Sequence, residues 1–558
     1  MDDFNLALVP ANDLESIQHA IDERLRMMSH LQNQVLQLQS HLNSLRPACR
    51  LPDEVLAEIF LECVKDCRAE YENAAWNDYG QQPYKWLPIT HVCHKWREAA
   101  LSHPRLWDWV VPLRPESTEA FIVRSGQRPL IVPQRRLPLY NHPVAGNRGP
   151  TVIRATSDMN TSLQLVFDQL YRVERIDLHS TCSTPEDPLP DAPLLRSLTI
   201  RDARAANASA LEYFKTLPLP SLTAFHCWCS PNVLTPFLRD NLTSLTLSCG
   251  LINKDGLLDI LQNMQMLTRL RVDKVEGVLP HAIPALPQPT RHVALPNLRY
   301  IHLTENREGR AAASLLQHLT LSDTATITVF AYQGLPQIEA TEVLFEAIGD
   351  LGGDDVPLVL GISTPNDKLE FSIWRAPQNL ETYRKQDTWG SPRIRFRSYV
   401  PPGRRTTCLE HFARSLAQRV ARVGVVFVDS QITSREWHDA FDALPAVHQV
   451  YVHGEGAKHL SAGLRPGTVQ PMLLHPILFP DLHTLVLEDV DWCTQTDPEV
   501  LCAHPCEVAT VLAAAIGERG GIPHLVIRQG KRIDEVDVEH IATWGNINTL
   551  DWDGLIYN

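Results

Sequence analysis

Residues 242–247 read LTSLTL, and close variants of this apolar-x-x-apolar-x-apolar unit recur along the chain. Side chains of an extended strand alternate between two faces, so the last two apolar positions of each unit share one face. Each unit therefore predicts one short strand with a buried side. The first six units have central residues spaced by 22, 27, 20, 25 and 31, namely Ile176, Leu198, Phe225, Leu245, Leu270 and Ile301.

The series becomes less regular at 302–425 and then resumes. In that stretch LVLGIS and LEFSIW read as strands, while TEVLFEAIG and HFARSLAQRVARV have a helical period. We interpret it as degenerate repeats with insertions, and a separate α/β domain is the alternative. The further copies are centred on Phe330, Val426, Val450, Leu485, Leu525 and Leu550.

Segments with helical period lie between the strands, as in GLLDILQNMQM at 256–266. The alternation of short strands and helical segments resembles the leucine-rich repeats, whose units span about 20–29 residues with one strand each. The resemblance implies fold class α/β, with an irregular leucine-rich-repeat-like solenoid over 156–558. Residues 112–155, rich in Pro, Arg and Gly, are expected to form a connecting region.

A different pattern occupies residues 49–110. Leu51-Pro52 is typical of a helix start, where the missing N–H of proline costs nothing. Short helices cannot bury this much apolar surface alone, so a partner surface is plausible. The apolar residues fall on two helical faces, one with Val55, Leu56, Ile59, Phe60 and Cys63 and one with Val92, Cys93, Trp96, Ala99 and Ala100.

These residues, followed by Pro104-x-Leu106-Trp107, resemble the F-box in the form common in mushroom-type fungi. The resemblance implies a three-helix F-box over 47–111 that binds a Skp-type adaptor and, through it, a cullin-RING ubiquitin ligase. An insert at 66–86 departs from the shortest form of the family. The alternative is a small helical bundle without a partner. The residues expected in the core or the adaptor contact are Leu51, Pro52, Ile59, Val92, Cys93 and Trp96.

Residues 13–46 are predicted to form a coiled-coil helix after a disordered tail at 1–12. A homodimer through 14–45 is one interpretation, and a single helix docked on this chain or on another protein is the other. Arg24 interrupts an otherwise apolar seam with the period of 3.5 that is typical of coiled coils. The seam consists of Leu14, Ile17, Ile21, Arg24, Met28, Leu31, Val35, Leu38, Leu42 and Leu45.

Composition narrows the class of protein. The 558 residues, 44% of them hydrophobic, suffice for more than one folding unit. A formal charge of −14 disfavours general binding to nucleic acid or anionic membranes. The twelve cysteines show no dense disulfide framework, and the start of the chain lacks a signal-peptide pattern. We therefore expect a cytoplasmic or nuclear protein with no membrane span.

Motifs for bond chemistry are absent from the sequence, including a phosphate-binding loop, a nucleophile elbow and HExxH. We expect no catalytic residues, no cofactor and no metal. Cysteine and histidine gather twice, but their spacing does not match a standard zinc site. These groups are Cys493, Cys502, His504 and Cys506, and Cys63, Cys67, His91, Cys93 and His94.

The segment RIRFRSYVPPGRR contains an alternation of arginine with apolar residues. On a strand the charges would share one face, where they could meet an acidic target, or they could form a solvated face. The arginines are Arg393, Arg395, Arg397, Arg404 and Arg405.

Two functional classes follow from the sequence. The first is a non-enzymatic substrate receptor of an SCF-type ubiquitin ligase, in which the F-box binds the adaptor and the repeats bind an unknown protein target. The second is a scaffold or interaction protein that uses the coiled coil and the repeats without ligase activity.

Overall fold

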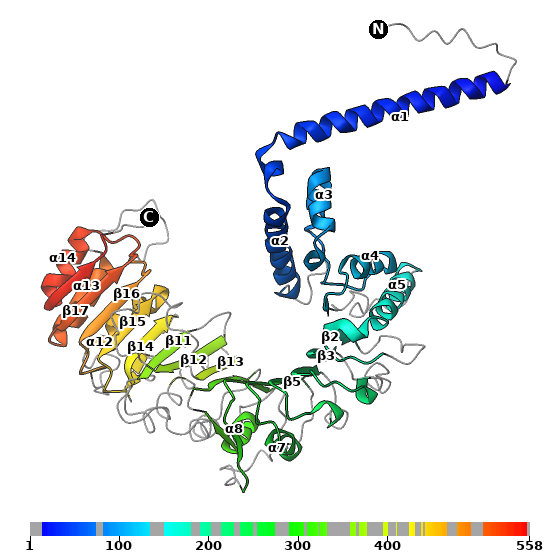
Figure 1. The fold of residues 1–558 in the computed structure, drawn as a ribbon. Helices are drawn as coiled ribbons and strands as arrows, with labels where there is room; N and C mark the ends of the chain where they lie inside the picture. Colours follow the sequence, from blue (N-terminus) through cyan, green and yellow to red (C-terminus); the bar gives the residue numbers. More distant parts are fainter. Residues whose placement is uncertain are drawn as a thin grey trace. The chain divides into compact units, whose positions relative to one another are not determined.

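The protein is described from a computed structural model, which has an α/β fold with a long, mostly parallel sheet (Figure 1). The chain divides into two compact units, one of residues 1–199 and 207–221 and one of residues 200–206 and 222–558. The structure describes residues 14–73, 82–133, 150–179, 190–201, 214–227, 235–248, 254–273, 290–305, 310–322, 324–331, 358–363, 368–375, 394–399, 409, 423–429, 433, 437–438, 441–442, 444–465, 477–492 and 506–554.

The first unit is mostly helical among its described residues. Two strands, β1 (Leu130–Val132) and β2 (Val173–His179), pair in parallel. The helices are α1 (Leu14–Ser44), η2 (Pro47–Arg50), α2 (Asp53–Asn73), η3 (Leu87–His91), α3 (His94–Leu101), η4 (Pro104–Leu106), α4 (Pro115–Arg124), α5 (Pro150–Phe167) and η6 (Leu170–Arg172).

An aromatic cluster forms part of the core of this unit. The rings of Trp86 and Trp107 lie 5.1 Å apart, and those of Tyr84 and Phe121 lie 4.3 Å apart. Trp107 is 1% exposed, and its indole N–H donates to the Ala100 carbonyl at 2.8 Å. The insert at 66–86 and the expected connecting region at 112–155 thus both supply core side chains.

Buried Arg172 joins α4 to the start of β2. Its guanidinium donates to the carbonyls of Ile122 at 3.0 Å and Arg128 at 2.9 Å, and to the Ser125 hydroxyl at 3.1 Å. Burial lowers the pKa of Arg172. The guanidinium thus hydrogen-bonds a carbonyl in the last turn of α4, where carbonyls lack a partner within the helix, and another in the segment that follows it.

The second unit contains most of the strands. Strand β3 (Ser197–Arg201) contains the division between the units. After it come β4 (Ala224–Cys227), β5 (Ser244–Ser248), β6 (Arg269–Asp273), β7 (Val293–Leu295), β8 (Tyr300–Glu305), β9 (Leu319–Leu321), β10 (Thr326–Ala331), β11 (Leu358–Ser363), β12 (Lys368–Arg375), β13 (Ile394–Tyr399), β14 (Val423–Asp429), β15 (Gln449–His453), β16 (Thr484–Glu488), β17 (Ile522–Arg528) and β18 (Ile547–Trp552).

The strands of this unit form a sheet in the order β4-β5-β6-β8-β10-β13-β12-β11-β14-β15-β16-β17-β18, while β7 and β9 pair separately. Among these described strands, only β12 runs antiparallel to its neighbours. Residues 364–367 are too few for the crossover that a parallel pair needs, so β11 and β12 pair antiparallel. Strands from the less regular stretch therefore extend the same sheet.

The repeated apolar positions form the core of the sheet. Every predicted central residue, from Ile176 to Leu550, lies in a strand, so the predicted strands are confirmed. The predicted buried face is wrong at Phe330, which pairs in register with Thr304 on the opposite face of the sheet. Leu245, Leu270 and Ile301 are neighbours in register, and each is at most 1% exposed. Because the repeat fixes the register, the intervening polar residues share the opposite face of the sheet.

Helices follow several strands of the second unit, and Figure 1 shows α13 and α14 beside β17. They bury side chains such as Leu258 on α7 and Ile516 on α13. The described helices are η8 (Thr235–Phe237), α7 (Lys254–Gln262), α8 (Arg310–Gln317), η13 (Gly454–His459), α12 (Leu460–Leu464), α13 (Glu507–Glu518) and α14 (Glu535–Trp544).

Candidate protein-binding surfaces

Two contacts join the segment before α2 to the start of α3. The Lys95 ammonium donates to the Leu51 carbonyl at 2.7 Å. The sulfur atoms of Cys49 and Cys93 lie 3.7 Å apart, and burial raises the pKa of Cys49, as does its hydrogen bond to Cys93. The structure thus brings together the segments that carry Leu51 and Cys93, two of the residues predicted from the sequence.

The apolar side chains of α2 point in two directions. Leu56 and Phe60 are at most 1% exposed, and the Phe60 ring packs against Trp96 at a centroid distance of 5.3 Å. Val55 and Ile59 are 43% and 44% exposed. The helix therefore uses one face for its own core and leaves another apolar face uncovered among the described residues.

The predicted adaptor residues differ in exposure. Val92 is 55% exposed and Pro52 is exposed, whereas Leu51, Cys93 and Trp96 are half-buried. Pro52, Val55 and Ile59 have the i, i+3, i+7 spacing of one helical face. Val55 was not among the contact residues predicted from the sequence, although it shares this spacing with Pro52 and Ile59. We name the exposed residues Pro52, Val55, Ile59 and Val92 the α2–α3 apolar set.

The polar face of the sheet contains a row of in-register side chains. His302 on β8 lies beside Arg271 on β6 and Thr328 on β10. Burial lowers the pKa of His302, and the positive charges of Arg271 and Arg397 lower it further. The Asp273 carboxylate opposes this lowering of the His302 pKa, and it also pairs with the Arg271 guanidinium at 3.0 Å.

The arginine segment carries less free charge than its sequence suggests. Buried Glu370 on β12 forms ion pairs with both Arg395 and Arg397 on β13, the first at 2.9 Å. The two arginines remain 35% and 39% exposed. Two guanidinium groups share one carboxylate, so the cluster keeps a net positive charge on a polar face. Arg393, Arg404 and Arg405 lie outside the described residues.

The cysteine and histidine groups were predicted not to bind metal. In the described part of the chain, no three His, Cys, Asp or Glu side chains are arranged to hold a metal ion. Cys506 is buried at the start of α13, and burial raises its pKa to about 11. Cys493, Cys502 and His504 lie outside the described residues.

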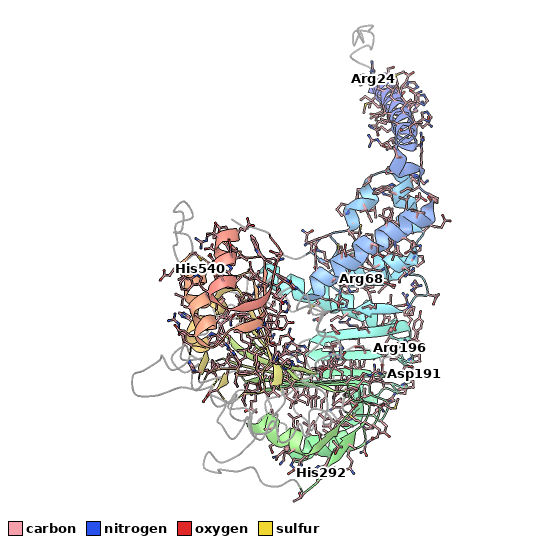
Figure 2. All side chains as sticks on the ribbon, turned by 90° about the vertical axis from the view of Figure 1, so that its left-hand side faces the viewer. Arg24, Arg68, Asp191, Arg196, His292 and His540 are labelled. Carbon is pink, nitrogen blue, oxygen red and sulfur yellow. The ribbon has the colours of Figure 1, made fainter. Side chains whose placement is uncertain are left out.

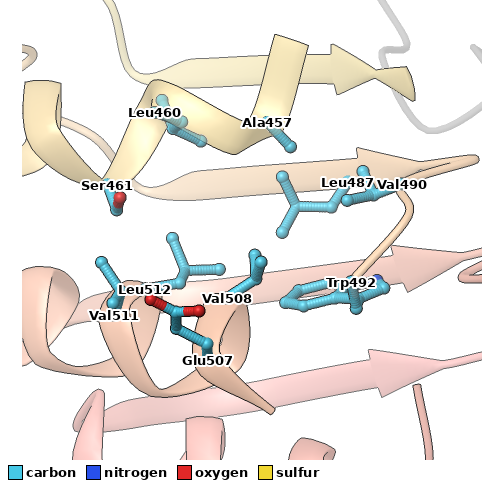
Figure 3. A pocket seen from close by; sticks show the side chains of 10 residues that line it. All are labelled: Ala457, Leu460, Ser461, Leu487, Val490, Trp492, Glu507, Val508, Val511 and Leu512. Atoms are coloured by element: carbon cyan, nitrogen blue, oxygen red, sulfur yellow. The ribbon is translucent and has the colours of Figure 1, made fainter. Parts of the chain in front are cut away.

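A cavity of about 200 Å³ lies between α12 and α13. Figure 3 shows that its walls are mainly aliphatic, with Trp492 at one end and the Glu507 carboxylate near α13. Such a lining suits an apolar group rather than bond chemistry. Its residues are Ala457, Leu460, Ser461, Leu487, Val490, Trp492, Glu507, Val508, Val511 and Leu512.

Comparison of the chain with protein-family models and with curated proteins finds no match. Among the described helices, none is both long enough and apolar enough to cross a lipid bilayer.

Proposed function

We propose that the protein is a substrate-receptor subunit of an SCF-type cullin-RING ubiquitin ligase. In this proposal residues 47–111 are an F-box that binds a Skp-type adaptor, the repeats bind a protein target, and other subunits transfer ubiquitin. The observation that carries the proposal is the two-sided apolar character of α2, because a helix whose core face is already packed gains nothing within the chain from Val55 and Ile59.

Target binding is assigned to the polar face of the sheet. The charged row around Arg271 and Arg395 offers many hydrogen-bond donors on rigid strands. Arg271 is paired with Asp273, whereas Arg395 and Arg397 share the single carboxylate of Glu370. In a chain of net charge −14, this local excess of positive charge favours an acidic segment of the target. The receptor itself performs no bond chemistry and acts in the cytoplasm or nucleus.

The adaptor contact is tested with Ile59→Glu combined with Val92→Glu. Both side chains are exposed, so the fold should survive, while a charge at a buried interface commonly costs about 2 kcal/mol or more. We expect Skp-type adaptor affinity to fall about thirtyfold or more in a titration by calorimetry. Leu51→Ala with Pro52→Ala should weaken capture in the same assay.

The matched control is Val123→Glu on α4, which is 71% exposed and outside the α2–α3 apolar set. It should bind the adaptor like the unmodified chain, and all variants should keep their circular-dichroism spectrum. Equal adaptor affinity of the Ile59→Glu, Val92→Glu variant and the control would contradict this contact surface.

The second candidate function is a scaffold without ligase activity. It is favoured by α1, which exposes large apolar side chains over most of its length. Co-purification separates the two functions. Adaptor together with cullin supports the ligase receptor, and self-association without either supports the scaffold.

A further inference from the structure

Helix α1 exposes an unusual amount of apolar surface. Its 31 residues span about 46 Å, and its large apolar side chains from Ile21 to Leu42 are roughly half exposed or more. Most of the stability of a helix in a protein comes from packing of its apolar face, so the exposed face of α1 calls for a partner. The exposed side chains are Ile21, Leu25, Met27, Met28, Leu31, Val35, Leu36, Leu38 and Leu42, followed by Leu45.

The residues that flank the seam on α1 carry no acidic or basic side chain other than one histidine. Charged flanking residues are what usually select a different partner or a direction in a coiled coil. Their absence means that two copies of α1 meet no like charges along the seam edges. The flanking residues are Gln18, Ala20, Leu25, Met27, Gln32, Gln34, Gln39 and His41.

Arg24, labelled on α1 in Figure 2, is the one charged residue of the seam, and its position distinguishes the two possible directions of a pair. In a parallel pair both Arg24 side chains occupy the same layer. In an antiparallel pair with full overlap, Arg24 lies opposite Val35, and the two guanidinium layers are about 16 Å apart. That separation exceeds the Debye length of about 8 Å at physiological salt, so the repulsion is screened.

We propose that α1 pairs with α1 of a second copy of this chain in an antiparallel, fully overlapping coiled coil. Each contact then occurs twice by two-fold symmetry. Four of the five kinds of layer are wholly apolar, and the two chains leave the pair at opposite ends. The layers are Leu14 with Leu45, Ile17 with Leu42, Ile21 with Leu38, Arg24 with Val35, and Met28 with Leu31.

The test uses the full chain with the photo-cross-linker p-benzoylphenylalanine in place of Leu42. Trypsin cuts after Arg24 and Arg26 and spares the Arg46–Pro47 bond, so the two ends of α1 fall in peptides 1–24 and 27–50. We expect a cross-linked dimer in which peptide 27–50 is joined to peptide 1–24. Light scattering should give twice the chain mass of 62.9 kDa.

The same cross-linker at Ser40, on the outer side of the helix, is the matched control and should lose the dimer band. Leu31→Asp with Leu38→Asp should give a monomer. Arg24→Leu removes the charge that disfavours a parallel pair, so cross-links between two copies of peptide 27–50 should then appear. Such links in the unmodified background, or a single-chain mass for the unmodified protein, would overturn the proposal.

Discussion

Glu370 on β12 compensates part of the positive charge of the arginine segment. It is 6% exposed and also accepts a hydrogen bond from the Ser372 hydroxyl at 3.2 Å. A buried carboxylate is stable only when paired, and here Arg395 and Arg397 supply the positive charge. These ion pairs therefore stabilise the polar face at β12 and β13.

We predict that Glu370→Gln destabilises the second unit by about 1–2 kcal/mol, because both guanidinium groups lose their counter-charge. The expected destabilisation is smaller than for a fully buried ion pair, because the two arginines are partly exposed and solvent screens their charges. The midpoint of urea unfolding measures it. Glu539→Gln, at an exposed position on α14, serves as control, and an equal midpoint for both variants would contradict the prediction.

At the scale of elements, the start of α13 is capped by a thiol. The Cys506 sulfur accepts from the Ala509 N–H at 3.4 Å and donates to the Trp492 carbonyl at 3.2 Å. The Cys506 N–H donates to the fully buried Asp537 of α14 at 2.6 Å. The cap therefore joins α13 and α14 to the segment that follows β16.

This cap predicts a loss of stability in alkali. The unfolded thiol ionises above about pH 9, while burial raises the pKa of folded Cys506 to about 11. The unfolded state therefore loses its proton first, and stability is lost as the pH rises between these values. Cys506→Ser keeps a capping oxygen and does not ionise.

From about pH 8 to about pH 10.5, the unmodified protein should lose about 1–2 kcal/mol more unfolding free energy than Cys506→Ser. Urea unfolding at both pH values under reducing conditions measures the difference, and the variant itself controls for other groups that titrate there. Parallel losses in the two proteins would show that the thiol does not contribute.

At the scale of the whole molecule, neighbouring strands depend on one another through the repeated core positions. Leu485 on β16 is fully buried and lies in register with Val450 on β15 and Leu525 on β17. Leu485→Ala should cost about 2–5 kcal/mol through lost burial and the cavity left behind. In a stacked array of repeats, this substitution destabilises the adjacent strands first.

Hydrogen exchange should therefore show lost amide protection in β15 to β18, while α3 of the first unit keeps its protection. Val123→Ala, at an exposed position, should leave all protection unchanged. A uniform loss over both units would mean that the chain unfolds as a single cooperative body.

The sequence by itself determined where the repeat strands lie and, except at Phe330, which side of each is buried. The spacing around residues such as Leu245 and Leu485 reports a local rule, because alternate side chains of a strand face opposite ways whatever the neighbours are. The exposed apolar residues of α1 were likewise readable from a heptad period. The α2–α3 apolar set was only partly visible, since Val55 and Leu56 look alike in sequence.

Only the tertiary structure decided which of these apolar residues are inside. Leu56 is buried because α3 and its neighbours cover that side of α2, and Val55 is not. The order β13-β12-β11 and the pairing of Glu370 with Arg395 likewise depend on which strands become neighbours. That choice rests on contacts between residues distant in the chain, which a local period does not encode.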